Sequence, residues 1–188
     1  GNNVTIDTNA SSTTGDLTLG VVTGGSNTLT LSTGNNVANS DITASGNISG
    51  VTTLTLADVG GTATLSGDVD VTALTAGNTV ANVALNGNGS SVANAVNFQN
   101  DGTLQLGDAS GDTLTFNNGL ITTSVGGTVT LNGTIATSNG GVVLGAVTLG
   151  SATTIDTNAS SNSADITVAA ITGGSNNLTL STGNNIAG

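Results

Sequence analysis

Aspartate is the only ionisable side chain in this sequence, so acid–base or metal chemistry would have to be built on it. The 188 residues include eleven acidic side chains, all Asp, and no Lys, Arg, His, Cys or Tyr. General acid–base and nucleophilic catalysis usually draws on the missing residue types, and tight zinc or iron sites need imidazole or thiolate ligands. We therefore predict that the chain is not an enzyme. Oxygen-seeking cations such as calcium remain compatible with it.

Two aspartate pairs have a spacing that suits calcium. The segment GDASGDTLTF at 107–116 resembles half of a repeats-in-toxin calcium turn, in which Gly and Asp alternate before a strand. Asp108 and Asp112, together with turn carbonyls, are its candidate ligands. Asp68 and Asp70 lie two residues apart, so in a strand they would share one face and could share a cation. The alternatives are structural: a Gly/Asp turn at 107–112 and a solvated pair at 68–70.

Other aspartates recur with their surroundings. Asp7 and Asp156 occupy the same place in two TIDTNAS segments, and Asp16 and Asp165 follow at the same distance. Their neighbours are small and polar, which favours Asx-turn hydrogen bonding. Paired carboxylates can act as a glycosidase dyad or an aspartic pair. No pair here is accompanied by an orienting group or by an aromatic platform for sugar, which supports the prediction of no catalysis.

The charge and composition also exclude several classes of binding partner. With a formal charge of −11 and no cationic side chain, the chain cannot displace phosphate counterions from nucleic acid and is repelled by anionic membranes. No apolar run is long enough to span a membrane. A hydrophobic content of 36% argues against disorder. The absence of Lys, Arg, Cys, Met, Trp and Tyr suits a long-lived extracellular material better than a cytosolic enzyme.

The elements that hold these residues are short strands. Apolar residues alternate with Thr, Asn or Ala in segments such as TLTL at 28–31, TLQL at 103–106 and TVTL at 128–131, and Gly/Asn-rich turns separate them. No apolar stripe with helical periodicity is long enough for a stable helix. Residues 4–39 also return as 153–188, at an offset of 149 residues. Long-period repetition of short strands is typical of a solenoid, so we predict an all-β parallel β-helix.

The spacing of the short strands predicts the length and number of the coils and the residues that face the interior. With coils of about 19–21 residues, the long repeat would hold seven or eight coils, and residues 1–188 would form one continuous segment of about 8–10 coils. Phe98 and Phe116 lie close to one coil apart and are a candidate interior pair, the alternative being two unrelated core residues. The residues predicted to point inward are Leu17, Leu19, Leu29, Leu31, Leu54, Leu56, Leu104, Leu106, Leu114, Phe116, Val129, Leu131, Leu178 and Leu180. Those predicted to point outward are Thr18, Thr30, Thr55, Thr115, Thr130 and Thr179.

Three longer strings resemble a known family. SNTLTLSTGNNV (26–37), VGGTVTLNGTI (125–135) and GGVVLGAVTLGSATTIDTNAS (140–160) resemble the strand repeats of filamentous-haemagglutinin-like exoproteins and large autotransporter adhesins. The resemblance implies a right-handed parallel β-helix, exported across the outer membrane of a Gram-negative bacterium, that serves as a stalk or adhesive fibre. This chain lacks the basic and aromatic patches with which some relatives bind glycans.

The expected function is therefore structural: a repeat segment of a giant secreted or cell-surface fibre whose partner is itself, end to end. Neither end carries the Lys, Pro or helix that would blunt an open strand edge, and the 149-residue repeat should appear as an axial repeat of about 33–38 Å. One alternative is a calcium-dependent surface-layer or biofilm-matrix protein. Another is a ligand- or ice-binding adhesin module that uses the TxT pairs at 28–30, 53–55, 62–64, 113–115 and 128–130.

Overall fold

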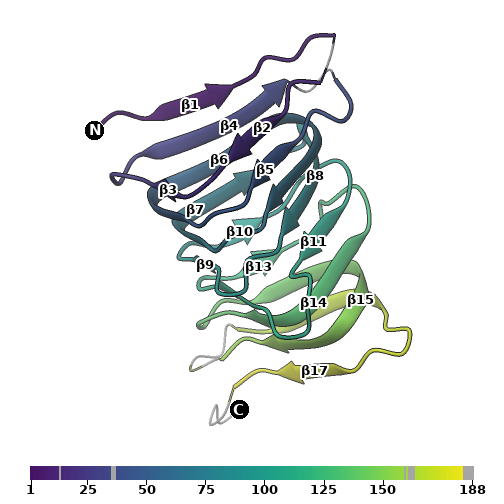
Figure 1. The fold of residues 1–188 in the computed structure, drawn as a ribbon. Helices are drawn as coiled ribbons and strands as arrows, with labels where there is room; N and C mark the ends of the chain where they lie inside the picture. Colours follow the sequence, from purple (N-terminus) through teal and green to yellow (C-terminus); the bar gives the residue numbers. More distant parts are fainter. Residues whose placement is uncertain (13, 35–36, 159, 161–163, 184–188) are drawn as a thin grey trace.

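The chain winds into a parallel β-solenoid of about 7 coils, where a coil is one full winding of the backbone (Figure 1). This is a computed structural model, and it describes residues 1–12, 14–34, 37–158, 160 and 164–183. Strands pair in parallel from one coil to the next, and no helix occurs among the described residues. The predicted all-β parallel fold is confirmed. None of the residues described forms a helix long and apolar enough to cross a membrane.

Within the described residues, seventeen strands make up the coils, and they join in one hydrogen-bonded sheet. In chain order they are β1 (Val4–Asp7), β2 (Leu17–Leu19), β3 (Val22–Thr23), β4 (Thr28–Gly34), β5 (Ile42–Ala44), β6 (Ile48–Leu65), β7 (Val69–Ala76), β8 (Val80–Leu85), β9 (Ser91–Val92), β10 (Val96–Asn97), β11 (Leu104–Leu106), β12 (Thr113–Phe116), β13 (Leu120–Ile121), β14 (Val129–Ala136), β15 (Val142–Asp156), β16 (Ile166–Thr172) and β17 (Leu178–Ser181).

The register divides this sheet into three stacks of strands along the solenoid axis. Stack 1 runs from β1 through β4, β6, β7, β10, β13 and β15 to the first half of β16. Stack 2 runs from β2 through β5, β6, β8, β11, β14 and β15 to the second half of β16. Stack 3 runs from β3 through β6, β7, β9, β12, β14 and β15 to β17. Each coil passes the three stacks in that order.

The coils are less uniform in length than the sequence suggested, and most are longer. Register partners in neighbouring coils lie from 18 residues apart (Val129 and Val147) to 26 apart (Val22 and Ile48). The expected coil of 19–21 residues was therefore too uniform. The difference arises in the corners, whose lengths vary: the segment between β1 and β2 is much longer than that between β7 and β8, although both join stack 1 to stack 2.

The interior follows the predicted two-residue alternation. Leu31 has 0% of its surface exposed while the adjacent Thr30 is half-buried on the outer side, so the predicted register is confirmed. None of the six threonines predicted to face outward is buried. The inward residues that are buried are Leu29, Leu31, Leu54, Leu56, Leu104, Leu106, Leu114, Phe116, Val129 and Leu131. The remaining four lie in the first or last coil, where the interior is open: Leu17, Leu19 and Leu178 are half-buried and Leu180 is exposed.

The two aromatic rings meet inside the solenoid, as one of the two predictions had it. The ring centroids of Phe98 and Phe116 are 6.3 Å apart with the planes at 88°, an edge-to-face pair. They do not occupy equivalent positions in successive coils, however. Phe98 follows β10 in stack 1, whereas Phe116 ends β12 in stack 3 and has Val92 as its register partner. The pair therefore spans the interior between two stacks.

The two sequence copies adopt the same strands but lie in different stacks. β1, β2, β3 and β4 return 149 residues later as the end of β15, the two halves of β16, and β17. Residues 184–188 of the second copy lie outside the described residues. Val4 belongs to stack 1, and its counterpart Thr153 belongs to stack 3. Val142 lies in stack 1, six full coils after Val4. From Val142 the chain passes on through stack 2 to Thr153 in stack 3, which adds two-thirds of a coil. The repeat thus spans six and two-thirds coils, instead of seven or eight.

Candidate functional site

Most recurring aspartates serve the backbone. The Asp7 carboxylate accepts the N–H of Asn9 at 2.8 Å, and the Asp156 carboxylate accepts the N–H of Asn158 at the same distance. Both asparagines have positive φ, 48° and 42°, which Asn tolerates better than most residues. The predicted Asx turn is confirmed in both copies of TIDTNAS. These two carboxylates hold the chain at the corner where a long loop leaves a strand.

A second group of aspartates links one coil to the next. Asp16 accepts the N–H of Asp41 at 3.1 Å, and Asp41 accepts the N–H of Thr62 at 2.7 Å, each one coil further on. Asp68 accepts the N–H of Gly89 at 2.7 Å in the same way. These carboxylates satisfy backbone donors just before β5 and β9 and within β6, and so add to the ladder between coils. Asp165, the counterpart of Asp16, is exposed in the last coil.

The candidate calcium pair Asp108 and Asp112 shares one tight turn. Asp112 is buried, and one of its carboxylate oxygens accepts the N–H groups of Asp108 and Ala109 at 2.7 and 2.8 Å. The turn before β12 is therefore organised around the Asp112 carboxylate. Calcium takes six to eight oxygen ligands, and no group of three or more His, Cys, Asp or Glu side chains comes together in the part of the chain that the structure describes. Calcium binding here stays a prediction.

Asp108 carries the one clear electrostatic perturbation resolved among these aspartates. Partial burial of its carboxyl against the turn raises the pKa of Asp108 above the ordinary value of 3.8. The hydrogen bond with the Asp112 side chain and the negative charge of Asp112 raise that pKa further. The negative charge of a neighbouring carboxylate disfavours the charged form of the Asp108 carboxyl.

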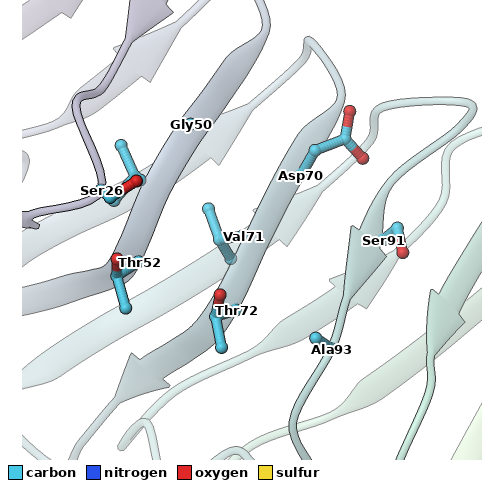
Figure 2. A pocket seen from close by; sticks show the side chains of 9 residues that line it. Ser26, Gly50, Thr52, Asp70, Val71, Thr72, Ser91 and Ala93 are labelled. Carbon is cyan, nitrogen blue, oxygen red and sulfur yellow. The ribbon is translucent and has the colours of Figure 1, made fainter.

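The two members of the second candidate pair, Asp68 and Asp70, have different surroundings. Asp68 lies just before β7 and is used by the next coil through its bond to Gly89, whereas Asp70 lies in β7 and is exposed. Asp70 lines a shallow groove of about 350 Å³, which crosses four coils where stack 3 gives way to stack 1 (Figure 2). Hydroxyls of Ser26, Thr52, Thr72 and Ser91 line the same groove.

The groove offers one carboxylate and several hydroxyls, so it can hydrogen-bond to water, a hydrated cation or a hydroxylated ligand. It has no cationic or aromatic side chain among its lining residues, and therefore lacks a strong anchor for a sugar. Sequence reasoning missed it because it depends on a register shift between Ser49 and Val51 against β7. The one available signal is Gly50, whose φ of +67° and close approach to Gly24 exclude a side chain.

The TxT pairs are spread over the three stacks. Pairs 28–30 and 53–55 are stacked directly in register in stack 1. Pairs 62–64 and 128–130 lie in stack 2, and pair 113–115 lies in stack 3. In stack 1 the next coil replaces the first Thr of the pair with Ala73. Complete TxT pairs therefore stack in register over two coils in stack 1.

Comparisons with known proteins do not narrow the function, since no protein-family model, curated protein or solved structure matches this chain. The fold class is consequently established by the strand register alone. What the described residues offer for function is an outer surface of small polar residues and the groove at Asp70.

Proposed function

We propose that this chain is a structural segment of a giant secreted or cell-surface bacterial fibre, of the filamentous-haemagglutinin-like or autotransporter-adhesin type, wound right-handedly. The observation that carries the proposal is the repeat of residues 4–39 as 153–188 within one parallel solenoid. A solenoid grows in one dimension as coils are added, so its natural product is length. The chain acts as a spacer and performs no chemistry.

The side chains support a mechanical role. Most of the buried side chains are aliphatic, and backbone ladders run along the axis from coil to coil. Pulling along the axis loads many parallel hydrogen bonds together. The outer surface carries Thr, Ser, Asn and Asp and a formal charge of −11, which keeps the fibre hydrated and separate from other acidic surfaces.

The composition supports an extracellular location. A chain without Lys or Arg has no cleavage site for trypsin-like proteases, and a chain without Cys or Met has few oxidisable side chains. The resemblance to exported repeat proteins points in the same direction, to the surface of a Gram-negative bacterium.

The test is surface labelling of the source organism. Antibodies raised against the folded chain should bind intact, unpermeabilised cells or the culture medium, and immunoelectron microscopy should place them on thin fibres. Labelling only after permeabilisation would contradict the proposal. Labelling of sheets that disperse when calcium is chelated would favour a calcium-dependent surface layer.

A further inference from the structure

Five Asn-Gly pairs lie within the described residues, and each is a place where the chain can react with itself. The pairs are Asn86–Gly87, Asn88–Gly89, Asn118–Gly119, Asn132–Gly133 and Asn139–Gly140. The backbone nitrogen of the glycine can attack the asparagine side-chain carbon Cγ, since a glycine has no Cβ to obstruct the approach. The reaction needs a free side-chain amide, an accessible glycine nitrogen and a group that takes the N–H proton. The fold therefore determines which of the five pairs can react.

Four of the five pairs are constrained by the fold. In each, a hydrogen bond fixes the asparagine side chain to a residue in a neighbouring coil, and the glycine is buried. The bonds join Asn86 Oδ1 to Gln105 Nε2 (3.0 Å), Asn118 Nδ2 to the Ala93 carbonyl (2.8 Å), Asn132 Nδ2 to the Gly107 carbonyl (2.9 Å) and Asn139 Oδ1 to the Ser160 backbone nitrogen (2.6 Å). An amide held in this way cannot turn its Cγ toward the following nitrogen without losing that bond.

The fifth pair, Asn88–Gly89, is not constrained in this way. Both residues are exposed and lie in the turn between β8 and β9. The Asn88 side chain forms no hydrogen bond with another described residue, so its amide is free to rotate. An added Cβ at Gly89 would have an Asp68 carboxylate oxygen as its nearest neighbour, at 3.3 Å, so no neighbouring backbone lies as close to the glycine as that carboxylate. The pair therefore combines a free amide with an accessible nitrogen.

Asp68 supplies the group that takes the proton. The Gly89 N–H donates to Asp68 Oδ1 at 2.7 Å, from the following coil. Asp68 is itself held in place, because its own N–H donates to Asn47 Oδ1 in the coil before at 3.0 Å. The distance between Asp68 and Gly89 lies within the range of about 2.6–3.2 Å over which a general base can accept a proton. The carboxylate thus faces the atom that must lose a proton when the Gly89 nitrogen attacks.

We propose that Asn88 is a modification site at which the folded chain deamidates itself, with Asp68 as the general base. The Gly89 nitrogen forms a bond to Asn88 Cγ and gives its proton to the Asp68 carboxylate. The bond between Cγ and Nδ2 of Asn88 then breaks, and Nδ2 leaves with that proton as ammonia. The product is a cyclic succinimide. Water adds to either carbonyl carbon of the ring and opens it, which leaves aspartate or isoaspartate at position 88.

The reaction consumes its own asparagine, so it occurs once per chain and adds to the spacer role without replacing it. Each product adds one negative charge to the formal charge of −11, in the coil next to Asp68. In isoaspartate the main chain also runs through Cβ, which lengthens the turn before β9. The Asn88 carbonyl accepts the Thr113 N–H of the next coil at 2.9 Å, so isoaspartate would disturb a link between two coils of stack 3.

Peptide mapping of the full chain, incubated folded in warm neutral buffer, tests the site. The chain has no Lys or Arg, so a protease that cleaves at Asp replaces trypsin, and fragmentation mass spectrometry then locates each converted asparagine. Asn88 should convert at least about tenfold faster than any other of the five asparagines. After unfolding in guanidinium the five should convert at similar rates. Equal rates in the folded chain, or faster conversion at another pair, would overturn the assignment of the site.

Substitution of Asp68 tests the role of the carboxylate. Asp68→Asn keeps an oxygen that can accept the Gly89 N–H but lacks the basic carboxylate, so conversion of Asn88 should slow by at least about tenfold. Asp70→Asn removes the same charge from an exposed position two residues away and should change the rate by less than about twofold.

Two further comparisons complete the test. Asp68→Ser, a second variant without the carboxylate, should slow the reaction as Asp68→Asn does, and the peptide map of the unaltered chain decides the site independently of both variants. An unchanged or faster rate in either Asp68 variant, with a strand-type circular dichroism spectrum retained, would show that Asp68 only holds the Gly89 N–H and would overturn its role as base.

Discussion

At the scale of single residues, the aspartates of this chain are chiefly backbone acceptors. Asp7 and Asp156 close Asx turns, and Asp16, Asp41 and Asp68 accept N–H groups from a neighbouring coil. A charged acceptor is strong, and one oxygen can hold a corner where no strand partner is available. A chain without any cation can therefore retain many carboxylates for structural reasons.

The Asp108–Asp112 turn leads to a pH prediction. The pKa of Asp108 is raised in the folded chain, so folding favours its protonated form. The stability that this group contributes is complete below the unfolded value of about 3.8 and is lost as pH rises through the higher folded pKa. Asp108→Asn removes that loss and should stabilise the chain at pH 7, by no more than about 0.5 kcal/mol because the site is exposed.

Thermal unfolding at pH 3 and pH 7 checks this expectation. The stabilising effect of Asp108→Asn should be present at pH 7 and absent at pH 3. Asp101→Asn removes one charge from another exposed turn and controls for the general reduction of negative charge. Equal stabilisation by both substitutions would show that net charge, and not contact with Asp112, is responsible.

At the scale of elements, each strand is a two-sided unit whose inner residues carry the stability. Leu31 is enclosed by Ile6 and Leu56, its partners in the coils before and after. Thr30 lies between Thr5 and Thr55 on the outer surface. The strands are short, so one misplaced side chain affects a large part of an element.

This contrast gives an element-scale prediction. Leu31→Ala should reduce the free energy of unfolding by about 2–5 kcal/mol, because it leaves a cavity at a fully buried site. Thr30→Ala should change it by less than about 0.5 kcal/mol, as expected at the surface. Guanidinium unfolding followed by circular dichroism measures both. A larger effect at Thr30 than at Leu31 would mean that the inner and outer faces are exchanged.

At the scale of the whole molecule, the sequence repeat does not contain a whole number of coils. The 149-residue unit spans six and two-thirds coils, so the second copy begins one stack before a full seventh coil would place it. Any feature of the outer surface would therefore recur on a different stack in each of three successive units and return to the first stack after every third unit. A fibre built this way displays each feature around its whole circumference.

A tandem chain tests this arrangement. Three copies of residues 1–149 followed by residues 150–188 should form one rod, in which each unit adds about 32 Å, from six and two-thirds coils at about 4.8 Å each. Gold labels on Thr123→Cys, an exposed position, should appear at that axial spacing and rotated by a third of a turn between units. Labels aligned along one side would show that the units contain whole numbers of coils.

The sequence by itself determined the class of fold and the local chemistry. The alternation of Leu and Thr in 28–31 has only one arrangement in which the apolar side chains share one face, and the repeated TIDTNAS segments predict the same Asx turn twice. For the same reason the inward positions, including Leu31 and Leu131, and the absence of helix from the residues that the structure describes were predictable. These features depend on residues close together in the chain.

Only the tertiary structure decided which coils are neighbours at each position. An alternating strand remains correctly oriented after any shift of two residues, and corners of different length permit many such shifts. The stacking of Thr28 on Thr53, the groove at Asp70 and the meeting of Phe98 with Phe116 across two stacks all depend on that choice. The placement of the two sequence copies in different stacks also depends on the tertiary structure. The summed lengths of all the corners determine in which stack a given residue lies, and no short stretch of sequence contains that information.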